Sequence, residues 1–280
     1  MKLSFSILSG VIQGLAEFLP ISSSGHLSIF QNIFGMSDGS AITAFNVLLH
    51  LGTLIAVFAV YFKDIFALVP AFFTLCGKLF SRKFSLRDYN ASERLLVLVI
   101  LATLPLIAVA VLGLDDYLEA VNGCLWAIGA ILIFNGFVLL ASDRVGKQNT
   151  DVCDLAPKKG FLVGLCQMCA LLPGLSRSGS TITGGLLVGL RREDAVKYSF
   201  ILSIPAILGA CVLELPALFE GGAVSTTQWA VYAAGAATAA VVGIASMKFL
   251  QYIAKKATFS GFSFYCFAVG VFAIVYDLAC

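Results

Sequence analysis

The sequence predicts an all-α polytopic membrane protein with six transmembrane helices and two re-entrant helical hairpins, arranged as an inverted-topology repeat. Of its 280 residues, 59% are hydrophobic and only 12% are charged, whereas soluble domains carry roughly 25% charged residues. A water-soluble chain of this composition would have too little polar surface, so we expect a lipid bilayer around it. The net charge of +2 is too small to indicate a nucleic-acid partner.

Six stretches are long and apolar enough to cross a hydrocarbon core, which takes about 20 helical residues. The predicted spans are 44–63, 94–113, 122–141, 196–218, 228–249 and 260–279. The stretch 64–80 is also apolar, but it carries Asp64, Pro70 and Lys78. We therefore expect it to lie along the membrane interface.

Two further apolar regions are interrupted by small polar residues. The region 3–34 breaks at the "PISSSGH" of 20–26, and the region 160–190 breaks at the "PGLSRSGST" of 173–181. The arms on either side of each break are too short to span a bilayer. Each region is therefore predicted to be a re-entrant hairpin, with its broken backbone satisfied by protein or by a watery cavity.

The two broken regions resemble each other in sequence. Setting Gln13 on Gln167 places the Ser-Ser-Ser-Gly of 22–25 on the Ser-Arg-Ser-Gly of 176–179. The following stretches, "FNVLLHLGTLIAV" and "YSFILSIPAILGA", then coincide as the first span of each half. An odd number of crossings per half inverts the second half in the membrane. The predicted halves of one integrated membrane domain are a first repeat, 1–145, and a second, inverted repeat, 160–280.

The distribution of charge gives an orientation. With these spans, all of the 18 Lys and Arg residues except Lys2 and Arg177 fall on one side of the membrane. The opposite side holds Asp115, Asp116, Glu119, Glu214 and Glu220. The positive-inside rule makes the basic side cytoplasmic. Both termini and the mouth of the first hairpin are then expected to face outward.

Away from loops and span ends, the ionisable side chains are Glu17, His26, His50 and Arg177. Each costs at least about 2.5–3.5 kcal/mol at mid-membrane, so each is a candidate for function. Hairpins that enter from opposite faces can meet at their tips near the midplane. A carboxylate, an imidazole, a guanidinium and several hydroxyls would then lie together. This set suits a phosphate, which arginine binds with two nitrogens and which helix N-termini attract.

Plainer interpretations apply to the same residues. Serines in membrane helices often bond only to the carbonyl four residues back. Glu17 and Arg177 could form an ion pair with a purely structural role. His50 is expected near the outer end of its span, where it could simply bond to a neighbour.

The segments "QGLAEFLPISSSGHL" (13–27) and "PGLSRSGST" (173–181), together with "LSIPAILGA" (202–210), resemble the bacitracin-resistance family of undecaprenyl-diphosphate phosphatases. The resemblance covers essentially the whole chain. It implies an integral membrane hydrolase of the bacterial inner membrane, with an active site that opens to the extracytoplasmic side. Such an enzyme removes the terminal phosphate of the polyprenyl diphosphate lipid released during wall polymerisation. It thereby supports peptidoglycan synthesis and resistance to bacitracin.

The resemblance also indicates site residues. Those falling on the family's motifs are Glu17, Ser23, His26, Ser176, Arg177 and Thr181, with Gln13 as the first motif position. Two departures matter: Gln13 is neutral where many members have Glu, and Asn46 stands where an acid is common. The first departure weakens any mechanism that needs two carboxylates, and we assign Asn46 no catalytic role.

Cleavage of a phosphoric anhydride requires charge neutralisation and an in-line nucleophile. We predict that Arg177 binds the transferred phosphate, aided by hydroxyls and amides of Ser176, Ser178, Gly179 and Thr181. The nucleophile could be Ser23, His26 or water, with Glu17 as the base or a metal ligand. Further candidates for the site are Gln13, Ser24 and His50.

A divalent cation, Mg²⁺ or Ca²⁺, is implied by the resemblance and prefers oxygen ligands. The chain offers too few carboxylates to hold it alone, so lipid phosphate would complete the coordination. The main alternative is a polyprenyl-phosphate flippase, since broken helices meeting at the midplane are also a transporter arrangement. A structural scaffold would leave the intramembrane charges unexplained. The expected partners are the lipid substrate and the bilayer, and a homodimer is compatible with the sequence.

Overall fold

The computed structural model describes residues 1–36, 40–80, 88–113, 121, 123–145, 148–214, 226–256 and 258–279, and these form helices without any strand. The helices, in chain order, are α1 (Leu3–Ala16), α2 (Ser23–Ile33), α3 (Ser40–Val60), α4 (Phe62–Phe80), α5 (Ala91–Val111), α7 (Leu125–Arg144), α8 (Pro157–Cys169), α9 (Arg177–Leu187), α10 (Arg192–Glu214), α12 (Thr226–Lys256) and α13 (Ser260–Ala279), with a short 3₁₀ helix at Val152–Asp154.

The helices α3, α5, α7, α10, α12 and α13 are long and apolar enough to cross a membrane. They correspond one to one with the six predicted spans, which confirms a multi-pass membrane protein. The largest difference is α12, which continues as one helix of 31 residues beyond the predicted end of its span. Helix α4 covers the stretch expected at the interface and is not among these six. The basic residues 82–87 and the acidic residues 115–119, which support the predicted orientation, lie outside the described residues.

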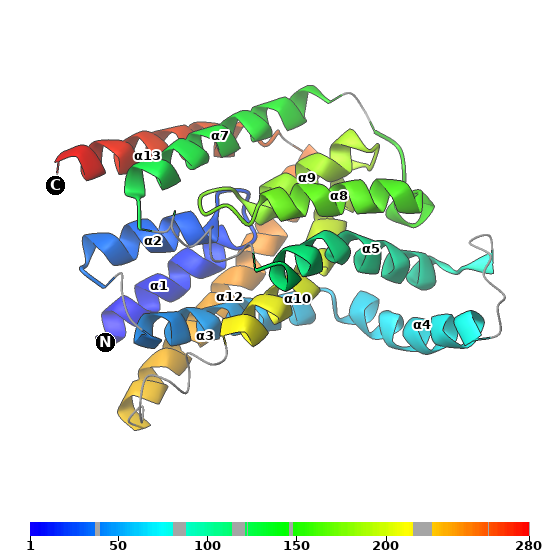
Figure 1. The fold of residues 1–280 in the computed structure, drawn as a ribbon, viewed down its shortest axis with the longest axis horizontal. Coiled ribbons are helices and arrows are strands. Elements are labelled where there is room, and N and C mark those ends of the chain that lie inside the picture. The colour runs from blue at the N-terminus through cyan, green and yellow to red at the C-terminus, as the bar shows by residue number, and fades with distance from the viewer. Residues whose placement is uncertain are drawn as a thin grey trace.

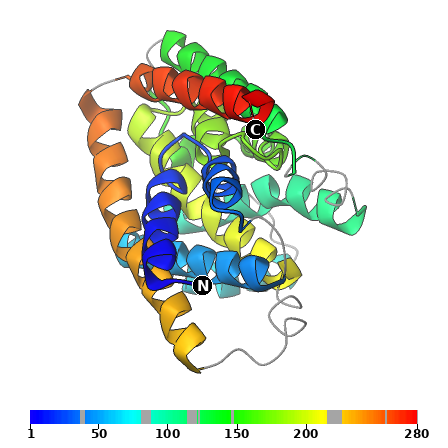
Figure 2. The same ribbon diagram turned by 90° about the vertical axis from the view of Figure 1, so that its left-hand side faces the viewer.

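Both interrupted regions form a helix, a break and a second helix. In Figure 1, the hairpin of α1 and α2 opens toward the side of the two termini, and the hairpin of α8 and α9 opens toward the opposite side. Figure 2 shows α1 and α2 side by side, viewed from the side of the termini. The tips touch: a Cβ on Gly25 would lie 3.1 Å from Cα of Gly174, and one on Gly179 would lie 3.4 Å from Cβ of Pro20. The alignment of the two halves sets Pro20 on Gly174 and Gly25 on Gly179, so each of these contacts corresponds to the other, as the predicted repeat requires. The repeat itself stays a prediction.

Small residues let several helices approach backbone to backbone, which is how membrane helices associate. A Cβ on Gly10 of α1 would lie 2.4 Å from the carbonyl oxygen of Gly235 in α12. Likewise, a Cβ on Gly164 of α8 would lie 2.5 Å from the carbonyl oxygen of Ala102 in α5. Each hairpin is therefore held against a span of the other predicted half.

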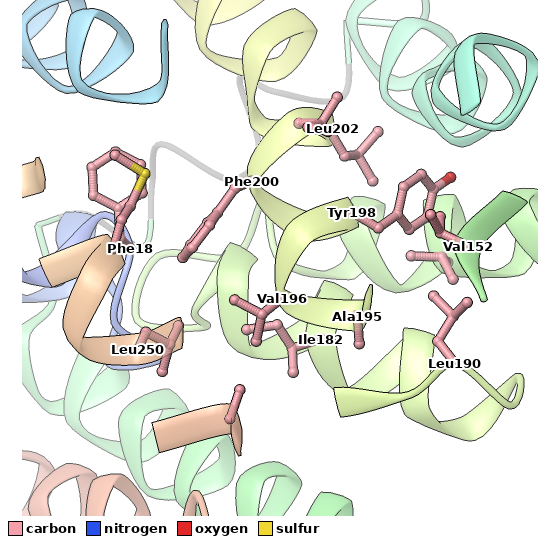
Figure 3. Close-up of a cluster of buried hydrophobic side chains, with 14 of the residues drawn as sticks. Phe18, Val152, Ile182, Leu190, Ala195, Val196, Tyr198, Phe200, Leu202 and Leu250 are labelled. Atoms are coloured by element: carbon pink, nitrogen blue, oxygen red, sulfur yellow. The ribbon is translucent and has the colours of Figure 1, made fainter. Parts of the chain in front are cut away.

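Helix α10 runs through the largest buried apolar cluster (Figure 3). Its Val196, Phe200 and Leu202 are buried among side chains of the hairpins and of α12, including Phe18 and Leu250. The outer surface, in contrast, exposes many large apolar side chains, as expected of a surface that faces lipid tails rather than water.

We expect Gly129→Leu to destabilise the protein, because the backbone of α13 packs directly against Gly129 of α7. A Cβ on Gly129 would lie 2.6 Å from the carbonyl oxygen of Gly270, and that backbone cannot rotate away. The expected cost is roughly 1–3 kcal/mol, as for other overpacked interiors. It should appear as a lower midpoint of thermal unfolding in detergent.

Gly209→Leu is the matched control, because Gly209 also lies within a helix but has no atom near the added Cβ. Equal unfolding midpoints for the two variants would show that α7 and α13 do not pack closely in solution.

Candidate active site between the hairpin tips

Glu17 lies at the C-terminal end of α1 and is the centre of a buried polar cluster. Only 6% of its surface is exposed. One carboxylate oxygen, Oε1, accepts a hydrogen bond from Nη2 of Arg177, which comes from the other hairpin. The other oxygen, Oε2, accepts from Nε2 of Gln13 at 2.9 Å and from the hydroxyl of Ser23 at 2.8 Å. The structure therefore brings together four of the residues that the sequence predicted.

Ser23 and Arg177 occupy equivalent positions, since each is the first residue of the helix that follows a break. The preceding residues, Ser22 and Ser176, cap these helices through their side-chain oxygens, each of which accepts from the amide three residues on. Among the described residues, no acceptor is found for the first two amides of either helix, those of 23–24 and 177–178. Two helix N-termini with free amides therefore meet beside Arg177, an arrangement that attracts an anion.

Ser22 carries local backbone strain at the tip of the first hairpin. Its φ of 74° is positive, and it is the only such residue besides glycines in the described part of the chain. Backbone conformations of this kind cost on the order of 1–3 kcal/mol and occur often at active sites. This bend turns the chain so that α2 begins with Ser23 directed at Glu17.

His50 belongs to the cluster, although the sequence had favoured a peripheral role. It lies in the middle of α3 rather than near the end of a span, because α3 begins at Ser40. Its Nδ1 is 2.9 Å from Nε2 of Gln13 and 3.5 Å from Oε2 of Glu17. The side-chain amide of Gln13 thus lies between a carboxylate and an imidazole.

His26 is directed away from this cluster. Its Nδ1 lies 2.8 Å from the carbonyl oxygen of Ser22, which can only accept, so Nδ1 carries the proton. Its Nε2 then accepts from the hydroxyl of Tyr265 at 2.9 Å, and the two rings stack with centroids 5.5 Å apart. The structure therefore places His26 one helical turn from Ser23 but gives its ring different partners.

The remaining predicted phosphate-binding residues hold the tip together. The hydroxyl of Ser178 donates to the carbonyl of Leu19 at 3.1 Å, which joins the two hairpins. The hydroxyl of Thr181 donates back to the carbonyl of Arg177 at 2.8 Å and lies 2.6 Å from that of Ser199, so it is satisfied within the protein. Ser24, a further candidate from the sequence, is exposed, and its hydroxyl oxygen lies 3.3 Å from that of Ser22.

Asn135, in the middle of α7, joins the two breaks and was not identified from the sequence. Its Nδ2 donates to the carbonyl of Pro20 at 2.9 Å, and its Oδ1 accepts from the amide of Ser176 at 3.2 Å. The side chain is fully buried. A single uncharged Asn within an apolar span was the one available signal, since such a residue must find partners inside the protein.

The residues fit a divalent cation only when a ligand supplies most of the oxygens. The described part of the chain contains no group of three His, Cys, Asp or Glu residues able to hold a metal. The oxygen donors at hand are Glu17, which already faces a guanidinium, and Oε1 of Gln13. That amide oxygen is buried and has no hydrogen-bond partner in the described part of the chain, a state that calls for an unseen partner such as water or a cation.

Fold and site together define a polytopic membrane protein in which a buried carboxylate, paired with a guanidinium and accepting from a hydroxyl, lies between two broken helices. These are the features of a membrane enzyme acting on a charged lipid head group. A family model described as bacitracin resistance protein BacA matches residues 6–272. The chain belongs to this family, as its motifs had predicted.

Curated relatives extend over almost the whole chain. A protein from Methanobrevibacter smithii named undecaprenyl-diphosphatase is 38% identical over 97% of this chain and 96% of its own length. Proteins of the same name from Desulforapulum autotrophicum and Alkaliphilus metalliredigens are 38% and 37% identical, and each alignment covers 98% of both chains.

We expect Asn135→Ala to impair both stability and activity. It leaves the buried amide of Ser176 without its acceptor, at a cost of about 1–3 kcal/mol. Among the described residues, it also leaves the carbonyl of Pro20 with only the thiol of Cys266, at 3.9 Å, as a donor. The substitution also allows the two hairpin tips to shift relative to each other, and small displacements at an active site lower the rate by up to roughly 100-fold. Thermal unfolding and turnover of the purified protein would measure the two effects.

Ser142→Ala is the control in the same helix, since Ser142 is equally buried but donates only to the carbonyl of Leu139. If Asn135→Ala behaves like Ser142→Ala, Asn135 does not hold the hairpins in register.

Proposed function

We propose that this protein hydrolyses undecaprenyl diphosphate to undecaprenyl phosphate and inorganic phosphate, and so recycles the lipid carrier for peptidoglycan synthesis and confers bacitracin resistance. The family and the names of the relatives support this activity. The observation that carries it is the meeting of Arg177, Glu17 and Ser23 beside two helix N-termini. The relatives are named for hydrolysis, which favours an enzyme over a polyprenyl-phosphate flippase.

Arg177 is proposed to bind the diphosphate. In the structure its guanidinium is paired with Glu17. A diphosphate arriving at the free amides of 23–24 and 177–178 would compete for the same guanidinium. When Arg177 turns to the phosphate, Glu17 loses its counter-charge and becomes a stronger base. Substrate binding would thereby prepare the base that the reaction needs.

Ser23 is the nucleophile that this geometry favours. Its hydroxyl already donates to Glu17 at 2.8 Å, whereas the ring of His26 is bound to Ser22 and Tyr265. Attack by Oγ on the terminal phosphorus would form an O–P bond and pass the hydroxyl proton to Glu17. The bond from that phosphorus to the bridging oxygen would break, and its electron pair would leave with undecaprenyl phosphate. Water would then hydrolyse the phosphoserine and release inorganic phosphate.

A divalent cation, Mg²⁺ or Ca²⁺, is proposed to accompany the substrate. Oε1 of Gln13 would be a protein ligand, Glu17 would be one only if it is not the base, and diphosphate oxygens would supply the others. Such an ion neutralises charge on the diphosphate when bound.

We place the protein in the bacterial inner membrane, with both termini outside and the site opening to the extracytoplasmic side. The support is the predicted one-sided distribution of Lys and Arg, together with the opening of the first hairpin toward the side of the termini. The homodimer stays a prediction.

We expect Arg177→Lys to lose on the order of 100-fold in turnover of undecaprenyl diphosphate, although the charge is kept. A lysine is a point charge and cannot hold two phosphate oxygens with a planar fork. Phosphate release by the purified protein would measure the loss. Arg191→Lys, on a half-exposed arginine paired with Asp151 and Asp194, is the control; equal rates for both variants would refute phosphate binding by Arg177.

We expect Ser23→Ala to abolish turnover and His26→Ala to retain slow turnover. Of these two residues, only Ser23 donates a hydrogen bond to Glu17. Acid quenching during turnover should trap a phosphoserine in the wild type. Ser24→Ala removes a neighbouring hydroxyl that is not on Glu17 and should stay active. An acid-labile phosphoenzyme that persists in Ser23→Ala and vanishes in His26→Ala would identify His26 as the nucleophile instead. If neither residue is phosphorylated and both variants are slow, water attacks directly.

A further inference from the structure

An apolar groove lies beside the first hairpin tip. Its volume is about 390 Å³, within the range of small-molecule sites. Of its nine lining residues, only Thr258 and Tyr265 carry a polar group. The others are Leu15, Leu19, Ile21, Phe249, Ile253, Gly261 and Phe262.

The floor of the groove belongs to the chain segment that carries the site. Leu19 and Ile21 are buried and lie between Glu17 and Ser23 in sequence. The rim is formed by α12 and α13, where Phe249 and Tyr265 are 50% and 44% exposed. A molecule in the groove would therefore touch the hairpin turn on one side and remain open to the surrounding lipid on the other.

Tyr265 connects the groove to the helix that carries the candidate nucleophile. The ring of Tyr265 lines the groove, and its hydroxyl bonds to His26. His26 and Ser23 are three residues apart on α2, so their side chains lie on one face of that helix, about 5–6 Å apart at Cβ. Ser23 thus lies one helical turn from the histidine that bonds to Tyr265 at the groove.

We propose that this groove binds the isoprenoid chain next to the diphosphate, with Tyr265 at the inner end of the groove between chain and head group. This inference rests on the proposed function, because it assumes a substrate that joins an apolar chain to a diphosphate. The lining contributes no charge, so it selects for a hydrocarbon rather than for a second polar group. Exposed rim side chains let a long chain continue from the groove into the bilayer.

A second hollow, at the mouth of the first hairpin, is the competing location for the chain. Its volume is about 520 Å³, and it is lined by Met1, Lys2, Ser4, Phe5, Leu8, Phe30, Phe34 and Met36. It lies at the opposite end of the hairpin from Ser23 and includes a lysine, which suits a head group better than a hydrocarbon.

A photo-crosslinking experiment separates these locations without requiring turnover. The probe is farnesyl diphosphate with a diazirine at the far end of its chain, bound to the full-length protein in nanodiscs. Label on residues 15–21 or 249–265 that is displaced by unlabelled undecaprenyl diphosphate is the expected result. Displaceable label on residues 1–8 or 30–36 would overturn the proposal in favour of the hairpin mouth. Label spread over the lipid-facing helices, or not displaced, would overturn it in favour of general lipid contact.

Gly261 allows the groove to be filled without disturbing the fold, because a Cβ there meets no atom within 4 Å. We expect Gly261→Leu to raise KM for undecaprenyl diphosphate about tenfold, the loss expected when roughly two methylene groups lose their burial. The kcat and the unfolding midpoint should stay unchanged. Gly209→Leu, equally open but outside the groove, should leave KM unchanged. An unchanged KM in Gly261→Leu would overturn the proposal, whereas a wild-type protein that labels in the groove yet releases no phosphate would refute only the proposed activity.

Discussion

The ion pair between Glu17 and Arg177 is the interaction on which the rest of the site depends, because it joins residues 160 positions apart across two hairpins. Burying two charges is costly, because the attraction between them seldom exceeds the free energy needed to remove both from water. Within a membrane protein the alternative of leaving either one unpaired is worse. The pair therefore requires neighbours that hold both hairpins in place. Those neighbours are the hydrogen bond from Ser178 to Leu19 and the two bonds made by Asn135.

This dependence explains why the tips contain glycine and serine rather than larger residues. Gly25 and Gly179 allow the backbones of the two tips to touch, and Ser22 and Ser176 end the breaks by capping the following helices. The first residues of those helices, Ser23 and Arg177, are thereby directed at the same carboxylate. A hydroxyl, a guanidinium and free amides converge without any metal cluster among the described residues. In the structure, the guanidinium of Arg177 is paired with the carboxylate of Glu17, and we propose that the diphosphate takes the place of this carboxylate.

The broad features followed from the sequence because each rests on local composition. Six apolar stretches of sufficient length predicted the six spanning helices, and small polar residues at 20–26 and 173–181 predicted both breaks. The membership of Glu17 and Arg177 in one cluster followed from the cost of isolated charges in a membrane, and that of Ser23 from the resemblance to the family's motif. His50 was undervalued, because its distance from the site depends on where α3 begins, and helix ends are poorly fixed by sequence.

Other features depend on tertiary geometry that periodicity does not reveal. Asn135 is a lone amide in an apolar span. It bonds to two backbone groups and to the sulfur of Cys266, 131 residues away, and none of these partners can be read from the pattern of apolar residues. The orientation of His26 depends on Tyr265, 239 residues away. The hydroxyl of Thr181 could equally have faced a ligand, and its bond to Ser199 emerges only once α9 and α10 pack.

The central claim is that the two hairpins act as one site through Glu17 and Arg177. A double-mutant cycle on kcat/KM for undecaprenyl diphosphate tests it most directly, with Glu17→Gln, Arg177→Gln and both together. Residues that work as a unit give strongly non-additive losses. We predict that the double variant is no slower than the slower single variant. If the two losses multiply instead, the residues contribute independently, and the pair is not the link on which the site depends.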